Sequence, residues 1–123
     1  MEHLSNPTSV LTKLRSKTNL RGIISIGVPN KDSLKAKLMK DKWSMIRPLG
    51  HLHYFSKKSI IKMLYNSGWE VLEIKSVRMG KVSTKDLIRE FDYSLPFYRI
   101  IKSLFFGQII LGKDQWYIQA RAK

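Results

Sequence analysis

The sequence of 123 residues contains no cysteine, and this excludes disulfide bonds, thiolate metal sites and cysteine nucleophiles. No run of apolar residues reaches the roughly 18–20 that a membrane-spanning helix requires. The first residues, Met1-Glu2-His3-Leu4, do not resemble the basic region that opens a secretory signal peptide. These absences together favour a cytoplasmic protein, with peripheral contact at a membrane as an open alternative.

Acidic residues are also scarce. Nine Asp and Glu stand against 23 Lys and Arg, which gives a net charge of +14. Residues 31–62 hold nine of the basic residues and only Asp32 and Asp41. A field of this kind attracts phosphates, acidic lipids or nucleic acid. No nucleic-acid motif is present, so we expect an acidic lipid or a phosphate-bearing substrate rather than a nucleic acid, or else a solvated basic surface.

Apolar spacing and capping residues predict a mixed α/β order in the first third of the chain. Asn6-Pro7 is typical of a helix start, and this helix should end near residues 19–22. Residues 23–28 form an apolar, β-branched run that predicts an inner strand covered on both faces. Proline and Asn30 end that run, and Asn30 or Asp32 should cap a second helix with Lys35 on its outer side.

The remaining elements follow similar signals. Ser56 should cap a third helix over residues 57–66, and Gly68 should close it. Strands are expected over residues 71–77 and 116–122. Between them, residues 83–111 favour two helical pieces broken at Pro96, and their apolar part, residues 95–111, suits a lid, a lipid contact or a core helix.

Four motifs occur in a definite order along the chain. They are Glu2-His3-Leu4, the strand ending in Pro29-Asn30, Gly50-His51-Leu52-His53-Tyr54-Phe55-Ser56, and Gly68-Trp69-Glu70-Val71. In this order they resemble the second half of a class I S-adenosylmethionine-dependent methyltransferase of the small-molecule type. The resemblance implies that Glu2-His3-Leu4 closes the fourth strand of that family's sheet. It also implies that the three later strands are the fifth, sixth and seventh, with the seventh antiparallel.

The fold class that follows is a partial Rossmann-like sheet of about three strands with flanking helices. The chain's seven glycines form no G-x-G-x-G motif, which in the family lies on the first strand and holds the cofactor. We therefore expect residues 1–123 to be a single C-terminal portion of a methyltransferase domain, without its N-terminal cofactor-binding half. The parent family uses S-adenosylmethionine, and this chain alone is expected to hold none.

The aromatic and histidine cluster supplies the candidate site residues. By resemblance, the loop with His51 and His53 lies at the mouth of the active site, where a neutral imidazole can take a proton from the acceptor. Either histidine can equally be a residue that fixes the loop. The candidate substrate-binding residues in the same basic region are Trp43, Tyr54, Lys57 and Lys58. The two lysines open a helix, where the macrodipole disfavours cations, so they are candidates for contact with an anion.

Glu2 and His3 are candidates for a metal site. Some relatives, including the O-methyltransferases of ubiquinone biosynthesis, have a Glu-x-x-Glu-His motif that binds a divalent ion, and Glu2-His3 resembles its end. His51 or His53 would complete such a site here, and carboxylate with imidazole suits Mg²⁺, Mn²⁺ or Zn²⁺. The alternative is a strand end without a ligand.

Three functions remain open from the sequence. The first is methyl transfer to a small-molecule, sugar or lipid-linked acceptor, with the isolated chain inactive because of truncation or gene splitting. The second is a basic binding module for acidic lipid or nucleic acid. The third is a subunit that completes a methyltransferase in trans with a chain carrying the missing half.

Overall fold

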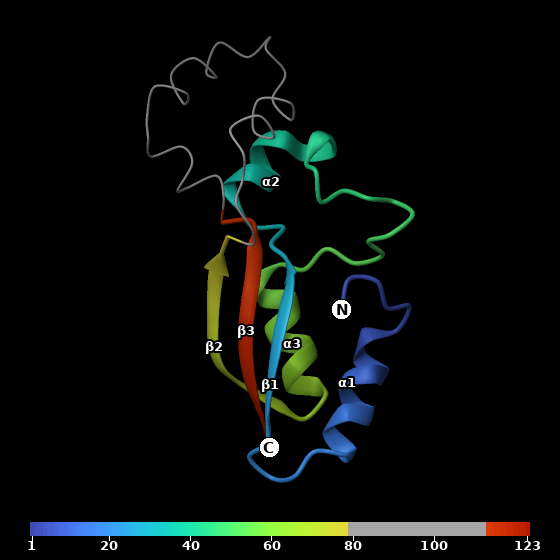
Figure 1. Cartoon of the computed structure of the whole chain (residues 1–123), viewed down its shortest axis with the longest axis vertical. Helices are drawn as coiled ribbons and strands as arrows, with labels where there is room; N and C mark the ends of the chain where they lie inside the picture. The colour runs from blue at the N-terminus through green and yellow to red at the C-terminus, as the bar shows by residue number, and fades with distance from the viewer. Residues whose placement is uncertain (79–112) are drawn as a thin grey trace.

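A computed structural model describes residues 1–78 and 113–123. The order of elements is α1, β1, α2, a short 3-10 turn η1, α3, β2 and β3 (Figure 1). Their bounds are Pro7–Ser16, Ile23–Pro29, Leu34–Met39, Lys40–Lys42, Lys57–Asn66, Trp69–Val77 and Gln115–Ala122. The helices expected within residues 83–111 lie outside the described residues. Within the described part, no helix is both long and apolar enough to cross a membrane.

The three strands form one sheet in the order β1-β3-β2 (Figure 1). The last strand lies in the middle and is antiparallel to both neighbours, with Ile118 opposite Ile26 on one side and Ile74 on the other. The predicted fold class is therefore confirmed, including the antiparallel last strand. Residues 1–4 form a turn, in which Leu4 N donates to Met1 O at 3.2 Å.

One face of this sheet packs against α1 and α3. Leu11 of α1 and Leu64 of α3 are fully buried in a cluster with Ile118 and Trp69. The Trp69 indole also donates to the backbone carbonyl of Leu11 at 3.0 Å, which ties β2 to α1. Burial of these side chains is the main stabilising contribution to the described core.

The prediction that the first strand is covered on both faces is wrong for β1. Ile23 is 61% exposed, and Ser25 and Gly27 are exposed too. Ile26 and Val28 are buried on one face while Gly27 between them is exposed, and the buried Pro29 ends the strand. This alternation of buried and exposed residues was not apparent from the sequence, because an isoleucine also occupies an exposed position. Strand propensity alone accounts for an isoleucine at that position.

A β-bulge in β2 resets the alternation of that strand. Val71 is opposite Ala120, and Glu73 is opposite Gln119, so Leu72 has no partner across the ladder. An extra residue of this kind shifts the face on which later side chains lie. Val71 before the bulge and Ile74 after it therefore both pack against the same core.

The second helix departs from the expectation in its cap and in the position of Lys35. Ser33 is the N-cap, and its hydroxyl accepts from Ala36 N at 3.1 Å. Asn30 instead accepts from Asp32 N at 2.8 Å and closes the turn before the helix. Lys35 is only 6% exposed, and its ammonium group lies 3.8 Å from the Asp114 carboxylate. A buried lysine needs such a partner.

The third helix matches its prediction at both ends. Ser56 is the N-cap and forms a capping box with Ser59, so two backbone N–H groups of the first turn are satisfied. Gly68 follows the helix with φ +83°, a conformation that residues with a Cβ rarely adopt. Phe55, two residues before the start of this helix, forms a β-bridge with Asn30, the residue that follows β1.

Candidate functional site

The segment between η1 and α3 contains four of the eight candidate site residues, and the start of the chain lies against it. The carbonyl oxygen of Glu2 accepts from Leu52 N at 2.7 Å and from His53 N at 3.2 Å. These two bonds fix the histidine loop, residues 50–54, beside residues 1–4. Within this loop, His51 lies beside His3, whereas His53 lines a cavity.

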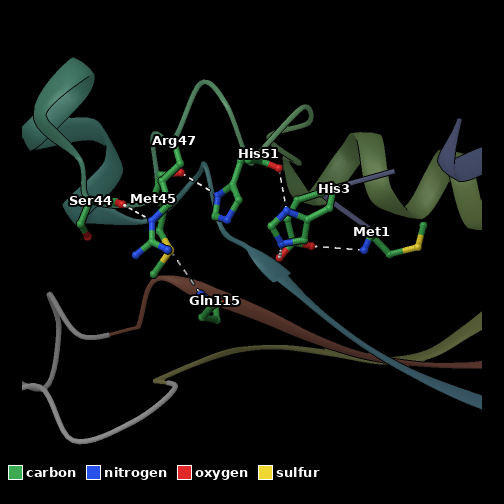
Figure 2. Close-up of polar contacts among 9 residues, drawn as sticks. Met1, His3, Ser44, Met45, Arg47, His51 and Gln115 are labelled. Atoms are coloured by element: carbon green, nitrogen blue, oxygen red, sulfur yellow. Dashed lines mark hydrogen bonds and ion pairs between the residues drawn. The ribbon is translucent and has the colours of Figure 1, made fainter. Parts of the chain in front are cut away.

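His51 is nearly buried, at 8% exposure. Its Nδ1 lies 2.7 Å from the Met45 carbonyl, and its ring meets the ring of His3 edge-on with centroids 4.8 Å apart. Figure 2 shows the two imidazoles side by side between Met45 and Met1. The Nδ1 of His3 likewise lies 2.6 Å from the Gly50 carbonyl. Because a carbonyl only accepts, each Nδ1 carries the proton, and in the neutral ring each Nε2 keeps a lone pair for a ligand.

Glu2, His3 and His51 could hold a divalent cation. Their ligand atoms lie within 4.8 Å of one another. Two nitrogens on one Zn²⁺ lie at most about 4 Å apart, so a small adjustment of the side chains is needed. The two backbone carbonyls orient the rings as outer-shell partners of metal-bound histidines do. The residues fit a metal, and the structure brings together three of the four candidate ligands. His53 is not part of this cluster.

His53 instead lines an open cavity of about 530 Å³. Trp43 and Tyr54, both predicted from the sequence, line it too, with ring centroids 6.3 Å apart. The Tyr54 hydroxyl accepts a hydrogen bond from Arg47 N at 3.1 Å, and this bond ties Tyr54 to the segment before the histidine loop. Three of the predicted site residues thus share one cavity.

Lys57 and Lys58 are not among the residues that line this cavity. The backbone N–H of Lys57 donates to the Asp32 carboxylate at 2.7 Å, so an anion of the protein itself occupies the start of α3. The cavity has two other lysines, Lys31 and Lys40. Sequence reasoning missed both, although they belong to the basic stretch that it singled out.

Two lining side chains carry buried nitrogens that have no hydrogen-bond partner within the part of the chain described. They are Nε1 of Trp43 and Nε2 of His53. Native proteins rarely leave buried polar atoms unpaired, and a ligand is one common reason. The side chains that line the cavity include an indole, an imidazole and two lysines, which together suit a polar small molecule.

Known proteins that resemble this chain identify its family. Residues 1–74 match the family described as "Methyltransferase domain". The fold is similar to the crystal structure of a SAM dependent methyltransferase from Archaeoglobus fulgidus, with a TM-score of 0.56 and 20% sequence identity. The match covers 98% of this chain and 54% of that one, so the chain spans about half the length of that structure. No curated protein matches. The chain belongs to the methyltransferase domain family and has the fold of a class I S-adenosylmethionine-dependent methyltransferase domain.

Proposed function

We propose that this chain forms the acceptor side of an S-adenosylmethionine-dependent methyltransferase that acts on a small-molecule, sugar or lipid-linked acceptor. The observation that supports this proposal is the cavity beside the histidine loop in a chain of this family. Its aliphatic and aromatic walls suit the body of an acceptor, and its few polar groups suit the fixing of its orientation.

His53 is the candidate base. Its side chain lines the cavity, and its Nε2 has no hydrogen-bond partner among the described residues, whereas His51 is not one of the residues that line the cavity. S-adenosylmethionine, when bound, supplies a methyl group on a sulfonium. His53 Nε2 would take the proton that the acceptor oxygen or nitrogen loses when it is methylated. The chain's further contribution is alignment of the acceptor.

The cofactor itself is expected to be held elsewhere. No G-x-G-x-G motif occurs within these 123 residues. We propose that residues outside them, on a partner chain or on a longer form of this one, bind S-adenosylmethionine. The chain alone is then inactive, and it acts only when the glycine-rich half is supplied.

Two measurements test this proposal. Calorimetry of the chain alone with S-adenosylmethionine should give no heat of binding, and micromolar affinity would contradict it. Transfer of labelled methyl to a panel of acceptors should appear only when a polypeptide with the glycine-rich half is added. In that assembly His53→Gln should lower kcat about 100-fold or more, the usual contribution of a general base. An unchanged rate in His53→Gln would remove His53 from the mechanism.

Metal binding at Glu2, His3 and His51 is a second candidate, favoured by the converging ligand atoms and the two oriented imidazoles. Titration with Zn²⁺ and with Mn²⁺ should show one site per chain. His3→Gln and His51→Gln should each weaken it by more than about tenfold, the smallest loss that is usual for an outer-shell partner of a metal ligand. His53→Gln is the matched control and should leave the affinity unchanged. Equal loss in all three variants would point to binding by scattered histidines.

A further inference from the structure

We propose that the cavity beside His53 holds an anionic group of the acceptor, a carboxylate or a phosphate, between the ammonium groups of Lys31 and Lys40. This inference depends on the proposed function only in identifying the bound anion as part of a methyl acceptor. The anion site itself is a property of the described residues and is tested without any methyl donor. Lys31 lies just after β1, and Lys40 begins η1, so two separate elements place a lysine at one cavity.

Charge is the first argument. Both lysines are exposed residues at the cavity, and none of the lining residues that the structure describes is acidic. The acidic neighbour of Lys31 in the sequence is Asp32, and its carboxylate is turned to the start of α3, where it accepts from Lys57 N. The Asp32 carboxylate therefore does not neutralise the positive charge at the cavity. A cleft with positively charged lysines and apolar walls raises the local concentration of an anion.

The unpaired indole nitrogen of Trp43 is the second argument. Trp43 is 3% exposed, and its Nε1 can only donate a hydrogen bond. A bound oxygen acceptor would satisfy this N–H after a small movement of the indole. Together with the two ammonium groups, it supplies the kind of donors that an oxyanion requires. The aliphatic side chains of Ile46 and Leu52, with the Tyr54 ring, complete walls that suit an apolar body behind the anionic group.

Backbone strain at Lys40 is the third argument. Its φ of 49° and ψ of −118° are a conformation that favours glycine, yet the residue is lysine. Strain of this kind persists where the surrounding structure imposes it, here at the C-cap of α2, and such residues cluster at active sites and ligand clamps. Lys40→Gly should therefore stabilise the fold and weaken anion binding at the same time, a pair of effects that a merely structural lysine would not produce.

The test uses the full chain and three probes of similar size: benzoate, phenyl phosphate and neutral benzamide. Binding is followed by calorimetry and by tryptophan fluorescence, since Trp43 lines the cavity. We expect benzoate or phenyl phosphate to bind and benzamide to bind at least tenfold more weakly. Binding of only one anion identifies which acid the site prefers. Binding of benzamide as tight as that of the anions, or no binding of any probe at millimolar concentration, overturns the proposal.

Variants locate the site. Lys31→Gln and Lys40→Gln should each weaken the anionic probe about tenfold, as expected for loss of one charged hydrogen bond. Lys58→Gln is the matched control, an exposed lysine of α3 that does not line the cavity, and it should bind as the parent does. Lys40→Gly should raise the thermal midpoint by about 4 °C while losing affinity. Equal weakening in Lys58→Gln would show attraction by net charge alone and would overturn the proposal.

Failure of this inference can be told apart from failure of the proposed function. If the anionic probes bind as expected but the assembled enzyme transfers no methyl group to any acceptor, the anion site stands and the proposed function fails. If methyl transfer occurs to neutral acceptors only and the lysine variants keep full affinity, the proposed function stands and the anion site fails.

Discussion

The Oδ2 atom of Asp32, in the turn after β1, accepts a hydrogen bond from the backbone N–H of Lys57, with 2.7 Å between oxygen and nitrogen. This contact joins the loop that follows β1 to the first turn of α3, beyond the Ser56 cap. A carboxylate at this position also interacts favourably with the helix dipole. The start of α3 thus has a cap from its own sequence and a second one from a distant loop.

Removal of this carboxylate should destabilise the fold. Asp32→Ala loses the bond to Lys57 N and should lower the free energy of unfolding by about 1 kcal/mol, the usual cost of a lost helix cap. Asp32→Asn keeps an oxygen acceptor and should lose less. Urea denaturation followed by tryptophan fluorescence measures both. Asp41→Ala, at an exposed aspartate in η1, is the control and should change little. Equal losses at both positions would mean that net charge matters rather than the contact.

Glycine is required at one position and dispensable at another. Gly68 has φ +83°, and a Cβ there would lie 3.1 Å from Cγ of Arg15. Gly68→Ala should therefore cost about 1–2 kcal/mol of stability. In β1, a Cβ added to Gly27 would have no neighbouring atom within 4 Å, so Gly27→Ala should be neutral or slightly stabilising. Thermal denaturation of the pair checks this, and a larger loss at Gly27 would contradict it.

Local signals in the sequence predicted the parts of the fold that depend on neighbouring residues. Ser56 and Gly68 define α3, and the β-branched runs define the strands, because caps and strand propensity act over a few residues. The burial of Lys35 could not be predicted in this way. It depends on Asp114, which is distant in sequence and comes close only when β3 inserts between the other two strands.

The residues of the candidate site likewise divide into those that local sequence predicts and those that depend on tertiary packing. The aromatic and histidine cluster identified Trp43, His53 and Tyr54, which lie close together in the chain and line one cavity. The basic stretch indicated attraction of an anion, but not which lysines face those rings. Lys31 and Lys40 come to the cavity through the turn after β1 and through η1, and only the packing of these elements shows it.

Tyr117 offers a test of the polar face of the sheet. Hydrogen bonds with the side chains of Ser25 and then of Gln119 lower the pKa of Tyr117 from its usual 10.0. The phenolate is thus favoured in the folded state. Its contribution to stability is present above the unfolded pKa and is lost as the pH falls through the folded pKa, so it is absent near neutrality.

Ultraviolet titration of the phenolate, with Tyr117→Phe subtracted to isolate this residue, should give a midpoint below that of free tyrosine. Ser25→Ala should raise the midpoint, because it removes the largest cause of the shift. A control at another tyrosine, Tyr65→Phe, should leave the Tyr117 titration unchanged. A midpoint unaffected by Ser25→Ala would show that the hydroxyl of Ser25 does not bond the phenolate.

Two buried tryptophans allow the hydrogen bond between β2 and α1 to be separated from packing. Trp69 donates from Nε1 to Leu11 O at 3.0 Å, whereas Nε1 of Trp116 is buried with no partner in the described residues. Both substitutions to phenylalanine remove similar volume, but only Trp69→Phe breaks a bond. Trp69→Phe should cost more than Trp116→Phe by about 1 kcal/mol, the net value of one buried hydrogen bond. Urea denaturation gives both values, and equal costs would show that this bond contributes nothing beyond packing.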